Sequence, residues 1–137
     1  MSRRQAREMA LQTLFQLDYN STGAGEAFAI VANEHVNIAE NTKKYAESLV
    51  NGTQEHITEI DTIISEASNE WKIDRMPGID RNIARIAIYE MRFGSETLPP
   101  NVVINEAVEL AKLFGTEESS RFVNGILGSL VSKCKVR

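Results

Sequence analysis

The stretch IDRNIARIAIYEMRF at residues 79–93 decides the fold, because it is apolar on most sides when it is read as a helix. A helix that is apolar nearly all round must be covered by other helices, so we expect it at the centre of the molecule. Glu90 lies within its apolar part, where we expect a buried or half-buried hydrogen-bonding residue rather than a catalyst. The other polar residues that interrupt the stretch are Arg81, Asn82, Arg85 and Arg92.

Two further helices are predicted after this stretch. Proline is tolerated in the first turn of a helix, so LPPN at residues 98–101 starts one, which ends at Gly115. We expect Gly115 to be a left-handed cap and Thr116 to cap the last helix. Gly125 and Gly128 lie one turn apart and are expected to permit close helix approach. The predicted core stripe of the last helix is Phe122, Val123, Ile126, Leu127, Leu130 and Val131.

Before the central stretch, apolar residues at alternating steps of four and three predict a seam that faces a partner helix. Asn51-Gly52 sits inside the seam, so the segment is either one long helix or two pieces with a kink. We favour a core helix of the same domain over a coiled-coil dimer, and a homodimer stays open. The seam is formed by Ala46, Val50, Thr53, Ile57, Ile60, Ile64, Ala67 and Trp71.

The first helix carries three arginines at its start, Arg3, Arg4 and Arg7, with no acid before Glu8. Ser2 and Gln5 have the spacing of a capping box, which predicts a helix beginning at Arg3. The amino end of a helix is partially positive, so cations fit poorly there. With a further, weakly patterned helix over residues 26–36, the whole chain (1–137) is predicted to be a single all-α domain of about seven helices.

The composition is typical of a soluble globular domain, with 42% hydrophobic and 25% charged residues. The net charge of −4 is uneven, because residues 1–7 carry +3, residues 8–70 carry −9 and residues 71–137 carry +2. A basic end and a mixed second half can receive nucleic acid, whereas the acidic block repels it. No stretch approaches the roughly 18 apolar residues of a membrane span, and no signal peptide is evident.

No catalytic or cofactor motif is found, so we expect a protein that is not an enzyme and holds no metal or cofactor. His35 and His56 have no partner at metal-ligand spacing. The single Cys134 excludes an internal disulfide and fits a reducing cytoplasm.

The arginine cluster supports two interpretations. It is either a solubilising end, with Arg4 paired to Glu8 four residues on, or a contact for the phosphates of RNA. Phe15 lies beside the core stripe of the same helix, where it either widens the core or anchors a partner protein.

Three blocks of the chain resemble the NusB family of bacterial transcription antitermination factors. They are RRQAREMALQTLFQLD, DRMPGIDRNIARIAIYEMRF and LPPNVVINEAVELAKLFGTEESSRFVNGILGSLV. The resemblance covers residues 3–131 and implies a helical fold of two small subdomains. It also implies binding to the single-stranded boxA element of nascent ribosomal RNA, together with the small-subunit ribosomal protein NusE. This complex helps RNA polymerase in the elongation complex resist termination.

The resemblance also implies where these partners bind. The NusE surface should include Phe15 and Asp80. Of the RNA-binding residues, Phe122 has the spacing of a core residue, although it could stack on a base, and Glu118 could accept from an exocyclic amine. The implied RNA surface is Arg3, Arg4, Arg7, Glu118, Ser119, Arg121, Phe122 and Asn124. The alternative is a helical protein–protein adaptor without specific RNA binding.

Overall fold

The computed structural model of the chain describes residues 2–20, 22–68, 76–94, 96 and 98–133. Every regular element in these ranges is helical, so the all-α prediction is confirmed. Trp71 of the predicted seam and Cys134 lie outside the described residues. The elements are α1 (Arg3–Tyr19), α2 (Ala24–Glu34), α3 (Glu40–Glu55), α4 (Ile57–Ser68), α5 (Gly78–Ile88), the π-helical turn η2 (Tyr89–Phe93), α6 (Pro100–Phe114) and α7 (Glu117–Lys133).

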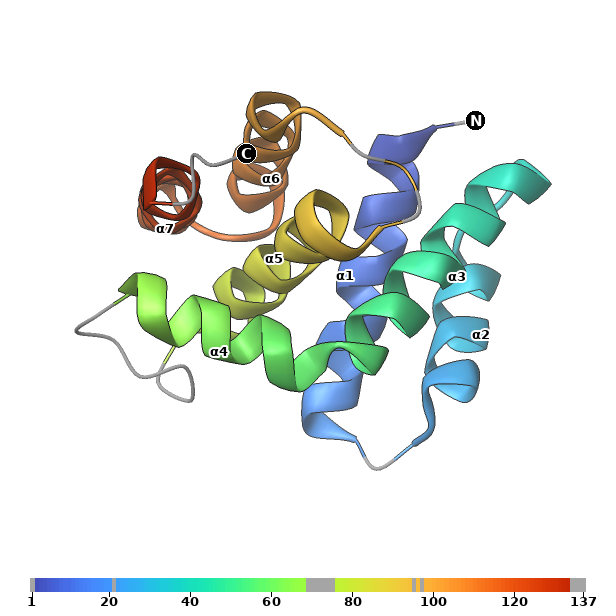
Figure 1. Cartoon of the computed structure of the whole chain (residues 1–137). Coiled ribbons are helices and arrows are strands. Elements are labelled where there is room, and N and C mark those ends of the chain that lie inside the picture. Colours follow the sequence, from blue (N-terminus) through green and yellow to red (C-terminus); the bar gives the residue numbers. More distant parts are fainter. Residues whose placement is uncertain (1, 21, 69–75, 95, 97, 134–137) are drawn as a thin grey trace.

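Helix α5 is the central element, as its sequence predicts. It contacts α1, α3, α4, α6 and α7, and Figure 1 shows it between α1 on one side and α6 and α7 on the other. Its side chains Ile83 and Ile88 are almost completely buried. Helices α1, α2 and α3 pack together, and α4 to α7 form a second group around α5. This arrangement matches the two small subdomains that the resemblance implies.

The seam before the central helix is divided into two helices, which resolves the alternative left open by the sequence. The break comes at His56, between α3 and α4, four residues after Gly52. Gly52 is buried against Tyr89, and a Cβ at this position would overlap the Tyr89 ring. The seam residues Ala46, Val50, Thr53, Ile60 and Ile64 are buried within the chain, so a coiled-coil partner is not needed to cover them.

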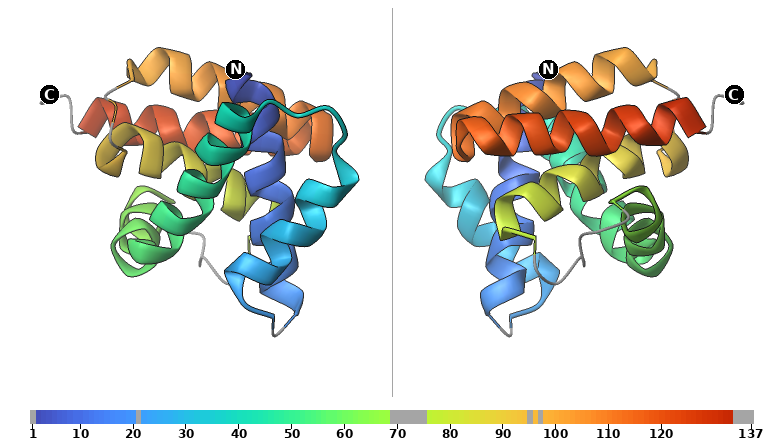
Figure 2. Two further views of the ribbon diagram at one scale, coloured as in Figure 1. Left: turned by 90° about the vertical axis from the view of Figure 1, so that its right-hand side faces the viewer. Right: turned by 90° about the vertical axis from the view of Figure 1, so that its left-hand side faces the viewer.

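Helices α6 and α7 meet at a tight connection, and α7 lies alongside α6 and packs on α5 (Figure 2). Gly115 ends α6, but its φ of −117° is not left-handed, so that expectation is wrong. Glycine is needed here because a Cβ would lie 2.5 Å from the Ser119 hydroxyl. The expectation for Gly125 and Gly128 is also wrong, because both are exposed and no atom lies near the position of a Cβ.

Candidate nucleic-acid interface

The start of α1 is built as its sequence predicts. The Ser2 hydroxyl accepts a hydrogen bond from the Gln5 backbone N–H at 3.1 Å, which caps the helix. The three arginines that follow point away from this cap toward three glutamates of other segments. Glu90 lies in η2, Glu96 follows η2, and Glu106 lies in α6. The carboxylates of this same chain therefore supply anions for the arginines, and the predicted Arg4–Glu8 pair is not the one formed.

Arg7 is buried in an ion pair with Glu90. Its Nε and Nη2 donate to the two carboxylate oxygens at 2.8 and 3.0 Å, and the two residues are 6% and 3% exposed. The Tyr45 hydroxyl donates a short hydrogen bond to the same carboxylate. The expectation that Glu90 is a buried hydrogen-bonding residue is confirmed. The Arg7 guanidinium is thus almost completely buried, and its charge is paired with Glu90 within the chain.

Arg3 and Arg4 remain at the surface. Arg4 Nε and Nη2 donate to the two oxygens of Glu106 at 3.1 and 3.0 Å, and the Arg4 side chain is 59% exposed. This contact raises the pKa of Arg4 and lowers that of Glu106. Arg3 donates to Glu96, and its guanidinium carbon lies 4.7 Å from the centre of the Tyr45 ring. Both cations therefore remain at the surface while already holding a carboxylate.

The start of α7 carries the second predicted group. Thr116 and Ser119 form a reciprocal cap: each backbone N–H donates to the other residue's hydroxyl, at 3.1 and 3.2 Å. This confirms Thr116 as the cap and leaves Ser119 only 7% exposed. Glu118, Arg121 and Asn124 are exposed on the same helix.

An open pocket of about 370 Å³ joins this helix to the start of α5. Asp80 is 4% exposed there, and its Oδ1 makes no hydrogen bond to any residue that the structure describes. Burial raises the pKa of Asp80, and a hydrogen bond with Ser119 partly opposes that rise. The pocket is lined by Pro77, Asp80, Glu118, Arg121 and Phe122. The structure thus brings Asp80 together with residues predicted for RNA, while Phe122 is half-buried against the core and also faces the pocket.

Phe15 lies elsewhere, at the far end of α1. Its ring packs on that of Tyr19, with ring centres 4.9 Å apart, and Tyr19 is 66% exposed. A Cβ at Gly78 would lie 3.3 Å from both side chains, so the pair abuts the first residue of α5. The two rings therefore form an aromatic surface beside the start of the central helix.

Comparison with known proteins gives the same family as the sequence motifs. A sequence model of the NusB family matches residues 4–132. The transcription antitermination protein NusB of Pelotomaculum thermopropionicum is 50% identical over 131 residues, which is 96% of this chain and 90% of the relative. That of Bacillus subtilis is 45% identical over 132 residues, covering 96% of each chain. The chain belongs to the NusB family.

The fold agrees with solved structures of the NusB family. One is a crystal structure of the antitermination factors NusB and NusE in complex with dsRNA. It matches with a TM-score of 0.85 and 32% identity, covering 96% of each chain. In that structure, a relative of this chain occurs together with a protein partner and RNA.

Sequence reasoning missed the acids that face the arginines in this NusB-family chain. Glu96 lies 93 residues after Arg3, and Glu106 lies 102 residues after Arg4, so no local sequence pattern connects the acids with the arginines. Tyr45 and Tyr19 were also missed, although an aromatic four residues after Phe15 is a detectable signal. The residues that do lie together are two groups, one around Arg3 and Arg4 and one around the start of α7.

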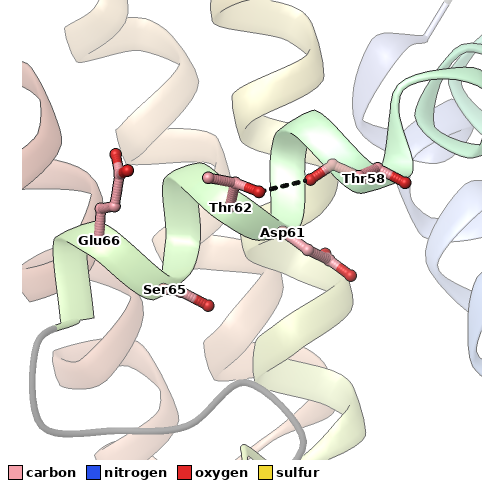
Figure 3. Close-up of a pocket in the computed structure, with 5 residues that line it drawn as sticks. All are labelled: Thr58, Asp61, Thr62, Ser65 and Glu66. Atoms are coloured by element: carbon pink, nitrogen blue, oxygen red, sulfur yellow. Dashed lines mark hydrogen bonds between the residues drawn. The ribbon is translucent and has the colours of Figure 1, made fainter.

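The remaining surface offers weaker candidates. A shallow depression on α4 is lined by five polar residues of that single helix, and Figure 3 shows Glu66 and Ser65 pointing to different sides of it. Asp61 within it is held by Arg85, whose nitrogens lie 2.8 and 2.9 Å from its oxygens. Over the described ranges, no three His, Cys, Asp or Glu side chains are placed to hold a metal ion. None of the described helices is long and apolar enough to cross a bilayer.

Proposed function

We propose that this protein is a transcription antitermination factor that docks on boxA-type single-stranded RNA together with the ribosomal protein NusE. The complex then helps the elongating RNA polymerase resist termination. Membership in a family whose relatives are named antitermination proteins supports the proposal, and a relative's structure contains NusE and dsRNA. The observation that carries it in this chain is the pocket at the start of α7, which combines the charged side chains of Asp80, Glu118 and Arg121 with the half-buried Phe122 ring.

The two surface groups have different tasks in this proposal. Arg3 and Arg4 contact phosphates, which supplies affinity without sequence choice. At the pocket, single-stranded bases are splayed out, so their edges and faces are accessible. Asn124, exposed on α7, then pairs with a base edge beside the pocket, the Phe122 ring stacks on a base, and Glu118 accepts from an exocyclic amine. Arg121 lies beside them as a second phosphate contact. Ser119 is buried in the cap with Thr116 and positions the start of α7.

Arg7 has a structural task in this arrangement. Its ion pair with Glu90 joins α1 to the end of the central helix, and Tyr45 of α3 joins the same carboxylate. The Arg3 guanidinium lies over the ring of that tyrosine. Arg7 therefore acts on RNA binding by positioning α1 with Arg3 and Arg4.

NusE is proposed to bind the aromatic surface formed by Phe15 and Tyr19, with Asp80 at its edge near α7. A half-buried ring packed on an exposed one presents a large apolar area that needs little reordering, as is typical of interface anchors. NusE bound at the start of α5 would lie next to the base-reading pocket. The partner would thereby strengthen RNA binding without contacting the arginines.

The test is fluorescence anisotropy with a labelled boxA RNA and a scrambled RNA of the same composition, each with and without NusE. The proposal predicts tighter binding to boxA, with a preference that NusE increases. Equal weak binding to both RNAs, unchanged by NusE, would reject it and leave the protein–protein adaptor. A Phe15→Ala variant serves as control: it is expected to lose the NusE effect and to keep the boxA preference of the protein alone.

A further inference from the structure

Arg3, which is half-buried, and Arg4, which is exposed, are both held by acids from one segment, the chain from the end of η2 through the first half of α6. Glu96 pairs with Arg3, and Glu106 pairs with Arg4. These ion pairs cover the groups that the proposed function assigns to phosphate. RNA phosphates must therefore displace these carboxylates in order to bind the two guanidinium groups.

Glu106 contacts the Arg4 guanidinium with the same geometry that a phosphate would use. Two nitrogens of the guanidinium donate to two oxygens at 3.1 and 3.0 Å, which is the fork geometry shared by carboxylate and phosphate. Glu106 Oε1 also lies 3.8 Å from Nη1 of Arg7. A phosphate cannot form a bidentate contact with the same two nitrogens while this carboxylate holds them.

The pair is also placed where it can be exchanged. The side chains of Arg4 and Glu106 are 59% and 25% exposed, whereas those of Arg7 and Glu90 are 7% and 2% exposed. An ion pair in contact with water contributes little stability, so exchanging its anion leaves the fold intact. The buried Arg7–Glu90 ion pair stays formed when RNA binds, so α1 keeps its position on the core.

We propose that Glu106 is an intramolecular competitor of RNA phosphate for the Arg4 guanidinium, and that it sets the affinity of the protein for RNA. This inference rests on the proposed function and adds a residue that limits binding. In the free protein the Arg4 guanidinium pairs with Glu106, and in the RNA-bound protein it pairs with a phosphate. The released carboxylate then lies beside the RNA backbone, where its charge opposes binding.

The decisive variant is Glu106→Gln, which keeps the shape of the side chain and removes its charge. It is expected to bind boxA about two- to five-fold more tightly than the parent protein, because RNA then no longer has to break an exposed ion pair of this modest strength. The gain should be largest at low salt and shrink as salt screens the exposed charges. A thermal melt checks that the variant is folded.

A matched control is Glu109→Gln. Glu109 lies in the same helix, lines the same cavity of about 140 Å³ beside Arg4 and carries the same charge. Its carboxylate lies near Lys112 at 3.6 Å rather than on Arg4. Loss of the Glu109 charge is expected to give a clearly smaller gain in boxA affinity, because it relieves only long-range repulsion between this carboxylate and the RNA phosphates.

A second control uses Arg4→Ala, alone and combined with Glu106→Gln. If Glu106 acts through Arg4, its removal gives no extra gain over the Glu109 control once Arg4 is absent. Equal gains for the two glutamine variants, or weaker binding by Glu106→Gln, would overturn the inference. Failure of the parent protein to prefer boxA over scrambled RNA would instead reject the proposed function, so the two failures are distinguishable.

Discussion

Arg7 and Glu90 form a bidentate ion pair, with nitrogen–oxygen distances of 2.8 and 3.0 Å, that joins the first helix to the π-helical turn at the end of the central one. Both side chains are removed from water, and Tyr45 donates a further hydrogen bond to the carboxylate. A buried pair leaves an uncompensated charge when one partner is lost. This cluster therefore links the proposed RNA-binding end of α1 to the core.

Removing one member of the Arg7–Glu90 pair should make the protein easier to unfold. Arg7→Met or Glu90→Leu is expected to lower the free energy of unfolding by about 3–5 kcal/mol, because the remaining charge stays buried. The double variant is expected to lose much less, since neither charge remains. Urea unfolding measures both values. Single variants within about 1 kcal/mol of the parent protein would show that water reaches the pair.

Close packing at Gly52 gives a second prediction. Gly52→Ala is expected to cost about 1–3 kcal/mol, because its Cβ would overlap the Tyr89 ring and force it to move. The control is Gly128→Ala, which faces open space in α7 and should stabilise the helix by about 0.5–1 kcal/mol. Thermal melts compare the two variants. The same sign for both would contradict the packing described at Gly52.

Arg4 and Asn124 should differ in their effect on RNA binding. Arg4→Ala is expected to weaken boxA and scrambled RNA equally and to reduce the salt slope by about 0.7, the value for one phosphate contact on a single strand. Asn124→Ala should weaken boxA alone and leave the slope unchanged. Anisotropy titrations over a range of salt concentrations separate these outcomes. Loss of boxA preference in the Arg4 variant would reject this division.

Asp80 should make stability depend on pH. Burial raises its pKa above the ordinary value of 3.8, so its charged form is disfavoured in the folded state. Stability from this group is complete below that value and is lost as pH rises through the raised pKa. Asp80→Asn should therefore stabilise the protein more at about pH 7 than near pH 3.8, as urea unfolding would show.

The exposed Glu118, at the mouth of the same pocket, provides the control for Asp80. Glu118→Gln should change stability little across this range, because its carboxylate is exposed to water in the folded protein as in the unfolded chain. A larger gain for Asp80→Asn at low pH than at neutral pH would contradict the burial of the Asp80 carboxylate.

The helices could be predicted because their signals are local. Each signal lies within one or two turns of the feature that it sets: the apolar surface of residues 79–93, the Ser2 cap and the prolines at the start of α6. Glu90 could be placed in the core because it interrupts an apolar stretch. Its partner Arg7 could not be named, because the contact joins residues far apart in sequence and depends on how α1 packs.

The candidate site was harder to predict for the same reason. Arginines at the partially positive start of a helix indicate that anions from elsewhere pair with them. Only the packing of α6 shows that Glu106 is one of these anions. Glycine spacing predicted close approach at Gly125 and Gly128, yet both face open space, because spacing alone does not say which side of a helix is covered. Gly115 is required by the Ser119 side chain rather than by its backbone angles.

The most direct test is to map the boxA binding surface by backbone amide chemical shifts of the 15.3 kDa protein. The amide signals of residues 3–4 and 117–124 are expected to shift when boxA binds, while those of residues 58–66 of α4, at the other polar depression, stay unchanged. Both groups should respond at the same RNA concentration, since one strand contacts them together. Shifts confined to α4, or absent from the start of α7, would contradict binding at this surface.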